Sequence, residues 1–269
     1  MASQHPTWIY GISDFSITEP LQNAGDIIAS GLDFIEPGLA KAAALSHADF
    51  EAAASRINDA GIRVQSMNWF LPPELKVVGP DVSHAACRRF LERALQRADH
   101  LNARAIVFGS PGSRSIPAGF SAIKAREQLI EFCFLTADLI NEAQYGMKIA
   151  VEHVNHTETN HLNTFAQALD LVREVDRAEV GLAADFYHFA MANESSEIML
   201  EAADLIHAVQ LANPAGRCFP RPDVEIPGLA QFFENLAAID YQGGISVEAT
   251  VTGALSEDCG AAAAFFKSL

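Results

Sequence analysis

The second half of the chain contains four short apolar segments, each with one oxygen-bearing side chain at or near its carboxyl end. These side chains are Glu152, Asp185, Gln210 and Glu248. Gathered at one point, three carboxylates and an amide would repel one another unless a cation lay between them. An all-oxygen ligand set suits a hard divalent ion such as Mn²⁺ or Mg²⁺ better than an ion that prefers thiolates. The residues therefore predict a divalent metal site, provided that the fold brings the four segments together.

Eight short apolar segments predict the strands that must position these residues. Most are rich in β-branched or other apolar residues and are bounded by Gly, Asp or Asn, as is typical of buried parallel strands. The predicted strands are Trp8–Ile12, Phe34–Glu36, Arg63–Met67, Ala105–Phe108, Lys148–Glu152, Val180–Asp185, Ile206–Leu211 and Gly244–Glu248.

Segments with helical periodicity alternate with these strands. They are Leu21–Ser30, His47–Ala60, Ser83–Leu101, Ala125–Tyr145, Thr164–Val175, Glu194–Ala203, Leu229–Ile239 and Glu257–Lys267. Such alternation predicts an α/β fold with a parallel sheet and right-handed crossovers. An open doubly wound sheet and a closed barrel both satisfy it, but no Gly-x-Gly-x-x-Gly follows the first strand. A chain of 269 residues without a repeat or linker favours a single (β/α)8 TIM barrel over residues 1–269.

The composition of the chain limits the binding partners and the cellular compartment that we expect. The chain has 18 basic and 34 acidic residues, a formal charge of -16, and no basic stripe, so nucleic acid and anionic membranes are not expected partners. The four scattered cysteines show no disulfide or zinc-finger spacing. The first seven residues do not resemble a signal peptide, and no apolar stretch approaches the roughly 18 residues that span a bilayer. We therefore expect a cytoplasmic protein.

Five segments, in the right order along the chain, carry a family resemblance. They are residues 31–37 (GLDFIEP), 108–114 (FGSPGSR), 151–160 (VEHVNHTETN), 185–188 (DFYH) and 210–217 (QLANPAGR). In these segments the chain resembles the xylose-isomerase-like TIM-barrel sugar isomerase/epimerase superfamily. Within it, the resemblance is to the hydroxypyruvate isomerases and to ketose 3-epimerases of the D-tagatose 3-epimerase type. It implies a small sugar or keto-sugar as substrate.

The resemblance also implies a metal-ligand set. Carried over by position, the ligands are Glu152, Asp185, Gln210 and Glu248. Mn²⁺ is the expected ion, with Mg²⁺, Co²⁺ and Zn²⁺ as alternatives. The ketose 3-epimerases have a histidine at the place of Gln210, whereas the hydroxypyruvate isomerases have a glutamine. His156 departs from both groups, which commonly have an arginine at its place. Barrels of the superfamily are often dimers or tetramers, so a homo-oligomer is open.

Moving a proton at the carbon next to a carbonyl needs a base, an acid and a polarised oxygen. A divalent ion would hold the substrate oxygens and stabilise an enediolate. We predict Glu152 and Glu248 as the acid/base pair on opposite sides of the substrate, able to support either epimerisation or isomerisation. The predicted substrate-binding residues are Glu158, His188, Arg217 and Trp69.

Other residues and other reactions are weaker candidates. Trp69 and its neighbour Phe70 are as well explained by core packing as by an apolar wall for a sugar, and Ser110 with Arg114 is a weak phosphate-binding signal. A metal-dependent lyase or dehydratase on the same barrel would use the same ligand set. An apurinic-site endonuclease should carry more metal-binding histidines and a basic groove. A non-catalytic sugar-binding barrel would have no need of an acid/base pair.

Overall fold

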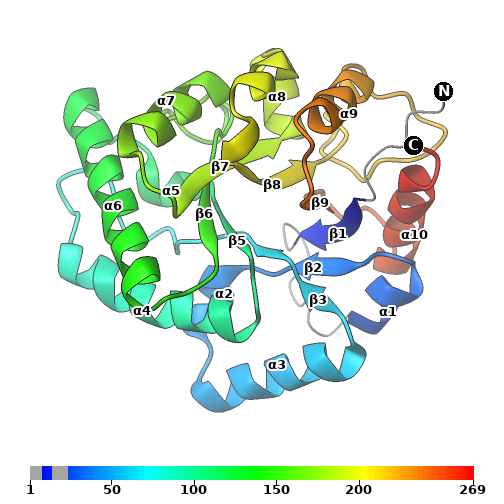
Figure 1. The fold of residues 1–269 in the computed structure, drawn as a ribbon, viewed down its shortest axis with the longest axis horizontal. Helices are drawn as coiled ribbons and strands as arrows, with labels where there is room; N and C mark the ends of the chain where they lie inside the picture. Colours follow the sequence, from blue (N-terminus) through cyan, green and yellow to red (C-terminus); the bar gives the residue numbers. More distant parts are fainter. Residues whose placement is uncertain (1–7, 14–23) are drawn as a thin grey trace.

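The computed structural model describes residues 8–13 and 24–269, and its strands form a ring inside a layer of helices (Figure 1). All strand pairs are parallel. The strands are β1 (Ile9–Ser13), β2 (Phe34–Glu36), β3 (Arg63–Val64), β4 (Ser66–Met67), β5 (Ala105–Phe108), β6 (Lys148–Glu152), β7 (Val180–Asp185), β8 (Ile206–Leu211) and β9 (Gly244–Val247).

The third predicted strand, Arg63–Met67, is broken into two at Gln65. Its first half, β3, pairs with β2, and its second half, β4, pairs with β5. The Gln65 carbonyl accepts a hydrogen bond from the Arg104 N–H (2.9 Å). β3 and β4 lie at the two ends of the strand order, and β1 pairs with both β2 and β9. The sheet therefore closes into a ring at the break between β3 and β4. The prediction of an α/β TIM barrel is confirmed.

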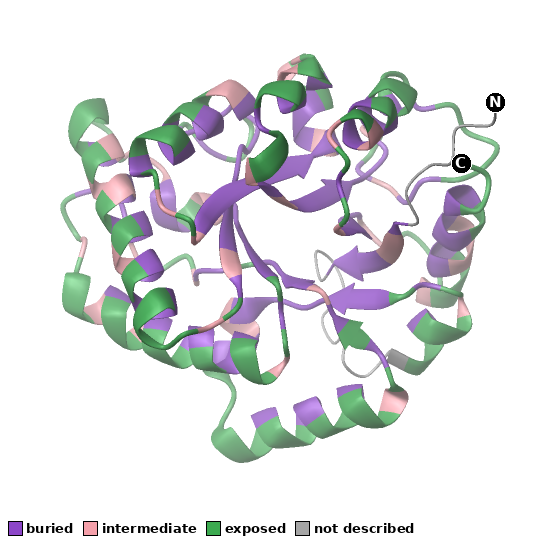
Figure 2. Ribbon diagram, viewed as in Figure 1, coloured by how far each residue is buried: buried purple, intermediate pink, exposed green. Residues whose placement is uncertain are grey.

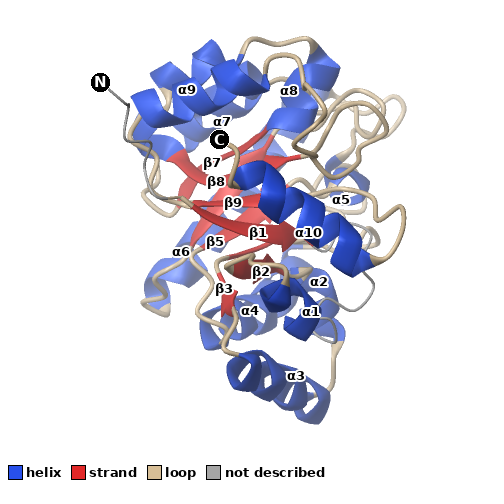
Figure 3. Ribbon diagram, turned by 90° about the vertical axis from the view of Figure 1, so that its right-hand side faces the viewer, coloured by secondary structure: helices blue, strands red, loops and turns tan. Residues whose placement is uncertain are grey.

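The helices cover the outside of the barrel and leave the strands at its centre (Figure 3). They bury one face against the strands and expose the other (Figure 2), as their amphipathic sequences predict. No helix in the described part of the chain is long and apolar enough to cross a membrane. The α-helices are α1 (Ala24–Ala29), α2 (Leu39–Ala44), α3 (His47–Ala60), α4 (His84–His100), α5 (Pro111–Arg114), α6 (Ala122–Glu142), α7 (Phe165–Val175), α8 (Phe186–Ala192), α9 (Leu229–Ala238) and α10 (Leu255–Phe266).

The helix that follows β7 differs from the prediction. The predicted helix Glu194–Ala203 is wrong, because α8 starts directly after the strand and ends where Asn193 adopts a left-handed conformation (φ 52°). The segment Ser196–Glu201 forms a 3-10 helix, η1, instead. The short helices α2 and α5 were not predicted, and residues 21–23 of the first predicted helix lie outside the described residues.

Small side chains line part of the inside of the barrel. Ala105, Val107, Ala150, Ala183 and Ala208 form a cluster of their own, separate from the large apolar core that includes the contacts between strands and helices. Side chains alternate between the two faces of a strand, so residues two positions further on also face inward. This alternation determines which side chains reach the carboxyl end of the barrel.

Candidate active site

The predicted metal ligands lie at the carboxyl ends of neighbouring strands and face the barrel axis. Glu152, Asp185 and Gln210 each lie two residues beyond an inward-facing alanine of β6, β7 or β8. Asp185 and Gln210 are register partners across β7 and β8. Glu248 directly follows β9, and its N–H donates to the Leu211 carbonyl (3.0 Å). The barrel therefore brings together side chains that are almost 100 residues apart in the chain.

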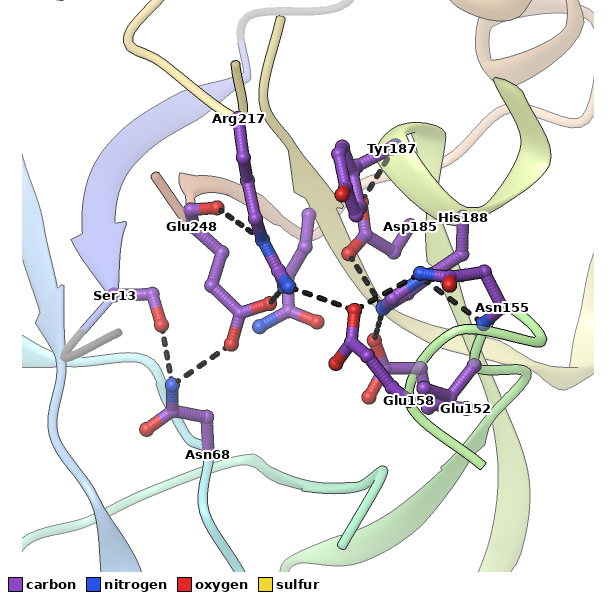
Figure 4. A network of polar contacts seen from close by, with 12 residues as sticks. Ser13, Asn68, Glu152, Asn155, Glu158, Asp185, Tyr187, His188, Arg217 and Glu248 are labelled. Atoms are coloured by element: carbon purple, nitrogen blue, oxygen red, sulfur yellow. Dashed lines mark hydrogen bonds and ion pairs between the residues drawn. The ribbon is translucent and has the colours of Figure 1, made fainter. Parts of the chain in front are cut away.

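The three carboxylates among the predicted ligands form a tight buried cluster with a histidine. Ligand atoms of Glu152, Asp185, His188 and Glu248 all lie within 4.8 Å of one another, and all four residues are buried. His188 Nε2 lies 3.3 Å from Glu152 Oε1 and 3.6 Å from Asp185 Oδ2 (Figure 4).

Three oxygens of the predicted metal ligands have no hydrogen-bond partner. They are Glu152 Oε1, Asp185 Oδ2 and Gln210 Oε1. A buried carboxylate or amide oxygen that lacks a partner is costly, and a cation among the three would remove that cost. The carboxylate and amide oxygens match the donors that Mn²⁺ and Mg²⁺ prefer. The residues present therefore fit the predicted divalent ion.

His188 turns its Nε2 toward the cluster and its Nδ1 toward Asn155. Its Nδ1 accepts from the Asn155 backbone N–H (3.2 Å) and lies 2.9 Å from the Asn155 side-chain amide nitrogen. The orientation of that amide is determined by Thr157, whose N–H donates to Asn155 Oδ1 (2.9 Å). With Nδ1 accepting, Nε2 carries the proton in the neutral ring and points into the cluster.

Asp185 has a structural role as well as a place in the cluster. Its Oδ1 accepts from the Tyr187 N–H (2.8 Å) and caps the N-terminus of α8. A helix cap is the ordinary explanation for an acidic residue after a strand, and here it uses only one oxygen. The other oxygen, Oδ2, faces His188 and the cluster.

Arg217 bridges two carboxylates at the pocket (Figure 4). Its guanidinium donates to Glu248 Oε2 (2.6 Å) and Glu158 Oε1 (3.0 Å) and stacks over the Tyr187 ring, with 4.4 Å to the centroid. The Arg217 backbone has a φ of 47°, which is costly for a residue with a side chain. Its carbonyl is held by the Thr250 N–H (2.8 Å), so the loops after β8 and β9 support each other.

Burial shifts the protonation of the cluster. Burial, with the nearby Glu248 carboxylate second, raises the pKa of Glu152 well above its usual value. Burial also raises the pKa of Asp185 to about 7. Burial lowers the pKa of His188 although Asp185 opposes the shift, which favours the neutral ring. Carboxyl groups with raised pKa values are suited to exchanging protons near neutral pH.

A pocket of about 270 Å³ opens above the cluster. Glu152, Glu158, His188, Arg217 and Glu248 line its polar part, together with Asn68. Its other walls are mostly apolar or backbone, from Trp69, Leu71, Pro73, Val107, Val154 and residues 109–112. The pocket thus pairs a charged floor with apolar sides.

The two aromatic candidates have different positions. Trp69 lines the pocket, is 45% exposed and has a left-handed φ of 44°, with Lys41 Nζ 4.9 Å from its ring. Phe70 is fully buried and packs edge-to-face on Phe108 at 5.5 Å. Core packing therefore explains Phe70 but not Trp69.

The weak phosphate signal is contradicted by the position of Arg114. This residue is fully buried, and one guanidinium nitrogen donates to the Phe108 carbonyl (3.2 Å). Burial lowers its pKa to about 10, while the Glu152 carboxylate raises it. Ser110 lines the pocket, but its hydroxyl accepts from the Leu71 N–H (3.1 Å).

His156 stands where the family pattern commonly has an arginine. It is exposed and does not line the pocket.

The sequence did not point to several other residues around the cluster. Glu36 accepts hydrogen bonds from Ser66 and from Gln210, and Asn68 donates to Glu248 Oε1 (3.1 Å). Gly109 leaves the space that the Glu152 carboxylate occupies, since an added Cβ would lie 2.2 Å from Oε2. All three lie at the carboxyl ends of β2, β4 and β5, at positions where the alternation of side chains along a strand points inward. This position is the signal that could have identified them.

The metal-free protein should lose stability as the pH rises. Asp185 has a folded-state pKa of about 7, and its unfolded value is about 4. The stability from its proton is fully present below the unfolded pKa and is lost as the pH rises through the folded pKa. We expect the Tm in chelator to fall between about pH 4 and about pH 7, and to fall less in Asp185→Asn. Circular dichroism melts check this, and identical pH profiles for the two proteins would contradict it.

A TIM barrel with carboxylates gathered at the carboxyl ends of its strands defines the class of protein. The profile of the xylose isomerase-like TIM barrel family matches residues 26–269, so the chain belongs to that family. D-allulose 3-epimerase from Methylomonas sp., solved with D-allulose, superimposes with a TM-score of 0.81 at 22% identity and covers 97% of each chain. 3-Keto-D-glucoside 4-epimerase from E. coli gives 0.80 at 18% identity and covers 97% of this chain and 100% of that chain.

Curated relatives match shorter segments of the chain. An inosose isomerase from Bacillus licheniformis is 48% identical over 58 residues, which are 22% of this chain and 20% of that protein. An L-ribulose 3-epimerase from Methylomonas sp. is 29% identical over 139 residues, 51% of this chain and 44% of that protein. The matches thus span less than half the length of these relatives.

Proposed function

We propose that the protein is a divalent-metal-dependent isomerase or epimerase of a small sugar or keto-sugar. The observation that carries the proposal is the set of buried oxygens without a hydrogen-bond partner on Glu152, Asp185 and Gln210. Of these three residues, Glu152 lines the pocket. The relatives named as inosose isomerase and L-ribulose 3-epimerase support the same class of substrate. The expected ion is Mn²⁺, held by Glu152, Asp185, Gln210 and Glu248. A cytoplasmic location and a homo-oligomeric state stay predictions.

Glu152 and Glu248 are the proposed acid and base. They come from β6 and from the end of β9, with β7 and β8 between them in the barrel, so they reach the pocket from different sides. A bound divalent ion would act as a Lewis acid toward the substrate oxygens. One glutamate removes a proton from the carbon next to the carbonyl, and the other returns a proton to the opposite face or to the adjacent carbon.

The neighbouring donors are proposed to bind the substrate oxygens. His188 Nε2–H and the Arg217 guanidinium are placed to stabilise the negative charge that develops on the carbonyl oxygen. Glu158 is positioned at the pocket to accept a hydrogen bond from a hydroxyl group. Trp69 offers an exposed ring against which the carbon face of a sugar can pack.

The reaction is tested by incubating the Mn²⁺-loaded protein in D2O with ketoses, aldoses, hydroxypyruvate and an inosose. NMR should show one substrate converted to an isomer with deuterium at the carbon next to the carbonyl. A product that has lost water would assign the protein to the lyases instead. Binding of a sugar without any turnover would indicate a sugar-binding protein.

Metal binding itself is a separate prediction. We expect one Mn²⁺ per chain, lost in Asp185→Ala, because this carboxylate supplies one of the oxygens without a donor. Asp185→Ser is the matched variant, since serine retains the helix cap that alanine removes, a difference of about 0.5–2 kcal/mol. Both variants should lose the ion, and only the alanine variant should lose the cap energy. Calorimetric titration measures the ion, and stoichiometric binding in either variant would refute the assignment of Asp185.

A further inference from the structure

Gln210 is the one predicted ligand whose side chain has two chemically different ends. Its amide oxygen can bind a cation, whereas its amide nitrogen is a donor only. Nε2 donates to Glu36 Oε1 (2.6 Å), and Oε1 has no hydrogen-bond partner. The oxygen is therefore the end of the amide that remains available to a cation.

Glu36 is a buried carboxylate without a cationic partner among the described residues. It ends β2 and is 1% exposed. One of its oxygens accepts from Gln210, and the other accepts from the Ser66 hydroxyl on β4. Burying an uncompensated carboxylate costs free energy. We therefore expect Glu36 to act on one of the side chains that it contacts.

We propose that Glu36 is a positioning residue that orients the Gln210 amide, so that its oxygen and not its nitrogen faces the metal site. Without Glu36, the amide N–H groups would be attracted to the neighbouring carboxylates, of which Asp185 is the register partner of Gln210. Glu36 provides a competing acceptor on the other side of the amide. Because Ser66 holds its second oxygen, the carboxylate itself is kept in place.

The proposal explains how a neutral side chain can serve as a ligand beside three carboxylates. Hydrogen-bonded partners behind metal ligands commonly set ligand orientation, and their loss typically costs about 10–100-fold in metal affinity. Here the partner joins strands that are not neighbours, because β1 and β9 separate β2 from β8 in the barrel. The inference rests on the metal site of the proposed function.

A double-mutant cycle on Glu36 and Gln210 tests the inference. Mn²⁺ affinity is measured by calorimetric titration in the unaltered protein, Glu36→Leu, Gln210→Leu and the double variant, with the fold checked by circular dichroism. If Glu36 acts through the amide, Glu36→Leu weakens Mn²⁺ binding by about 10–100-fold in the unaltered background. In the Gln210→Leu background the same substitution should have no further effect.

A conservative variant separates orientation from folding. Glu36→Gln retains an acceptor for the Gln210 N–H, while its own amide N–H can donate to the Ser66 hydroxyl. It should therefore bind Mn²⁺ more tightly than Glu36→Leu, even if both melt at the same temperature. If Glu36→Leu alone does not fold, a cycle of Glu36→Gln, Gln210→Leu and the variant that carries both measures the coupling instead.

The outcomes distinguish this inference from the proposed function. An unaltered protein that binds no Mn²⁺ refutes the metal site of the proposed function. An unaltered protein that binds Mn²⁺, together with unchanged affinity in Glu36→Leu or losses that add in the double variant, refutes the role of Glu36 alone.

Discussion

Replacing Glu248 by glutamine is expected to slow the chemical step by about 100-fold or more. The substitution keeps an oxygen that can face the metal but removes the group that would take or return the carbon-bound proton. The loss should therefore appear in kcat more than in KM. Steady-state kinetics on the substrate identified by NMR, with Mn²⁺ at saturation, measures it.

Glu158→Gln is the matched control, because both carboxylates pair with the Arg217 guanidinium. Glu158 has no place in the proposed acid/base pair, so its loss should act mainly through substrate affinity and raise KM. Near-normal kcat in Glu248→Gln would overturn the two-glutamate mechanism, whatever Glu158→Gln does. Equal kcat losses in the two variants would assign the effect of Glu248 to the ion pair with Arg217.

Replacing Gly109 by alanine should displace the Glu152 carboxylate. The added Cβ would lie 2.2 Å from Glu152 Oε2 and 3.3 Å from Glu152 Cδ. Gly109 has no left-handed φ, so alanine is compatible with its backbone and the effect comes from the contact. A misplacement of about 1 Å in a catalytic group can cost roughly 100-fold in rate, and we expect a loss of that order with weakened Mn²⁺ binding.

Gly112→Ala, in the short helix α5 just after Gly109, is the control for crowding alone. Its Cβ would lie 2.7 Å from the Pro73 Cβ, an apolar neighbour outside the carboxylate cluster. Both variants should lose about 1–3 kcal/mol of stability from overpacking, but only Gly109→Ala should lose Mn²⁺ affinity. Equal Mn²⁺ affinities in the two glycine variants would show that Glu152 tolerates the crowding.

The strand ends were predictable because buried parallel strands are short, apolar and sharply bounded. Glu152 is recognisable in this way, since a glutamate is an unusual end to an apolar strand. His188 lies in α8 and Arg217 in the loop after β8, and only the family resemblance pointed to their roles. Their roles in binding a substrate stay predictions.

Glu36 and Asn68 could not be selected from the sequence alone. A glutamate at the end of a three-residue strand and an asparagine after a broken one are common at exposed turns, and neither reveals its partner. The partner of Glu36 lies 174 residues away. Helix α8 was missed for a related reason. It is only seven residues long, and the sequence pattern of Asp185 fits a metal ligand as well as a helix cap.

The pairing of β1 with β9 has a consequence for the synthesis of the protein. β1 is made long before β9, which covers one of its edges and begins at Gly244. Until then, the N–H and C=O groups along that edge of β1 lack their final partners, and exposed strand edges favour association between chains. The newly made chain thus carries an open sheet edge from the synthesis of β1 until that of β9, and chaperone binding during that interval would shield it.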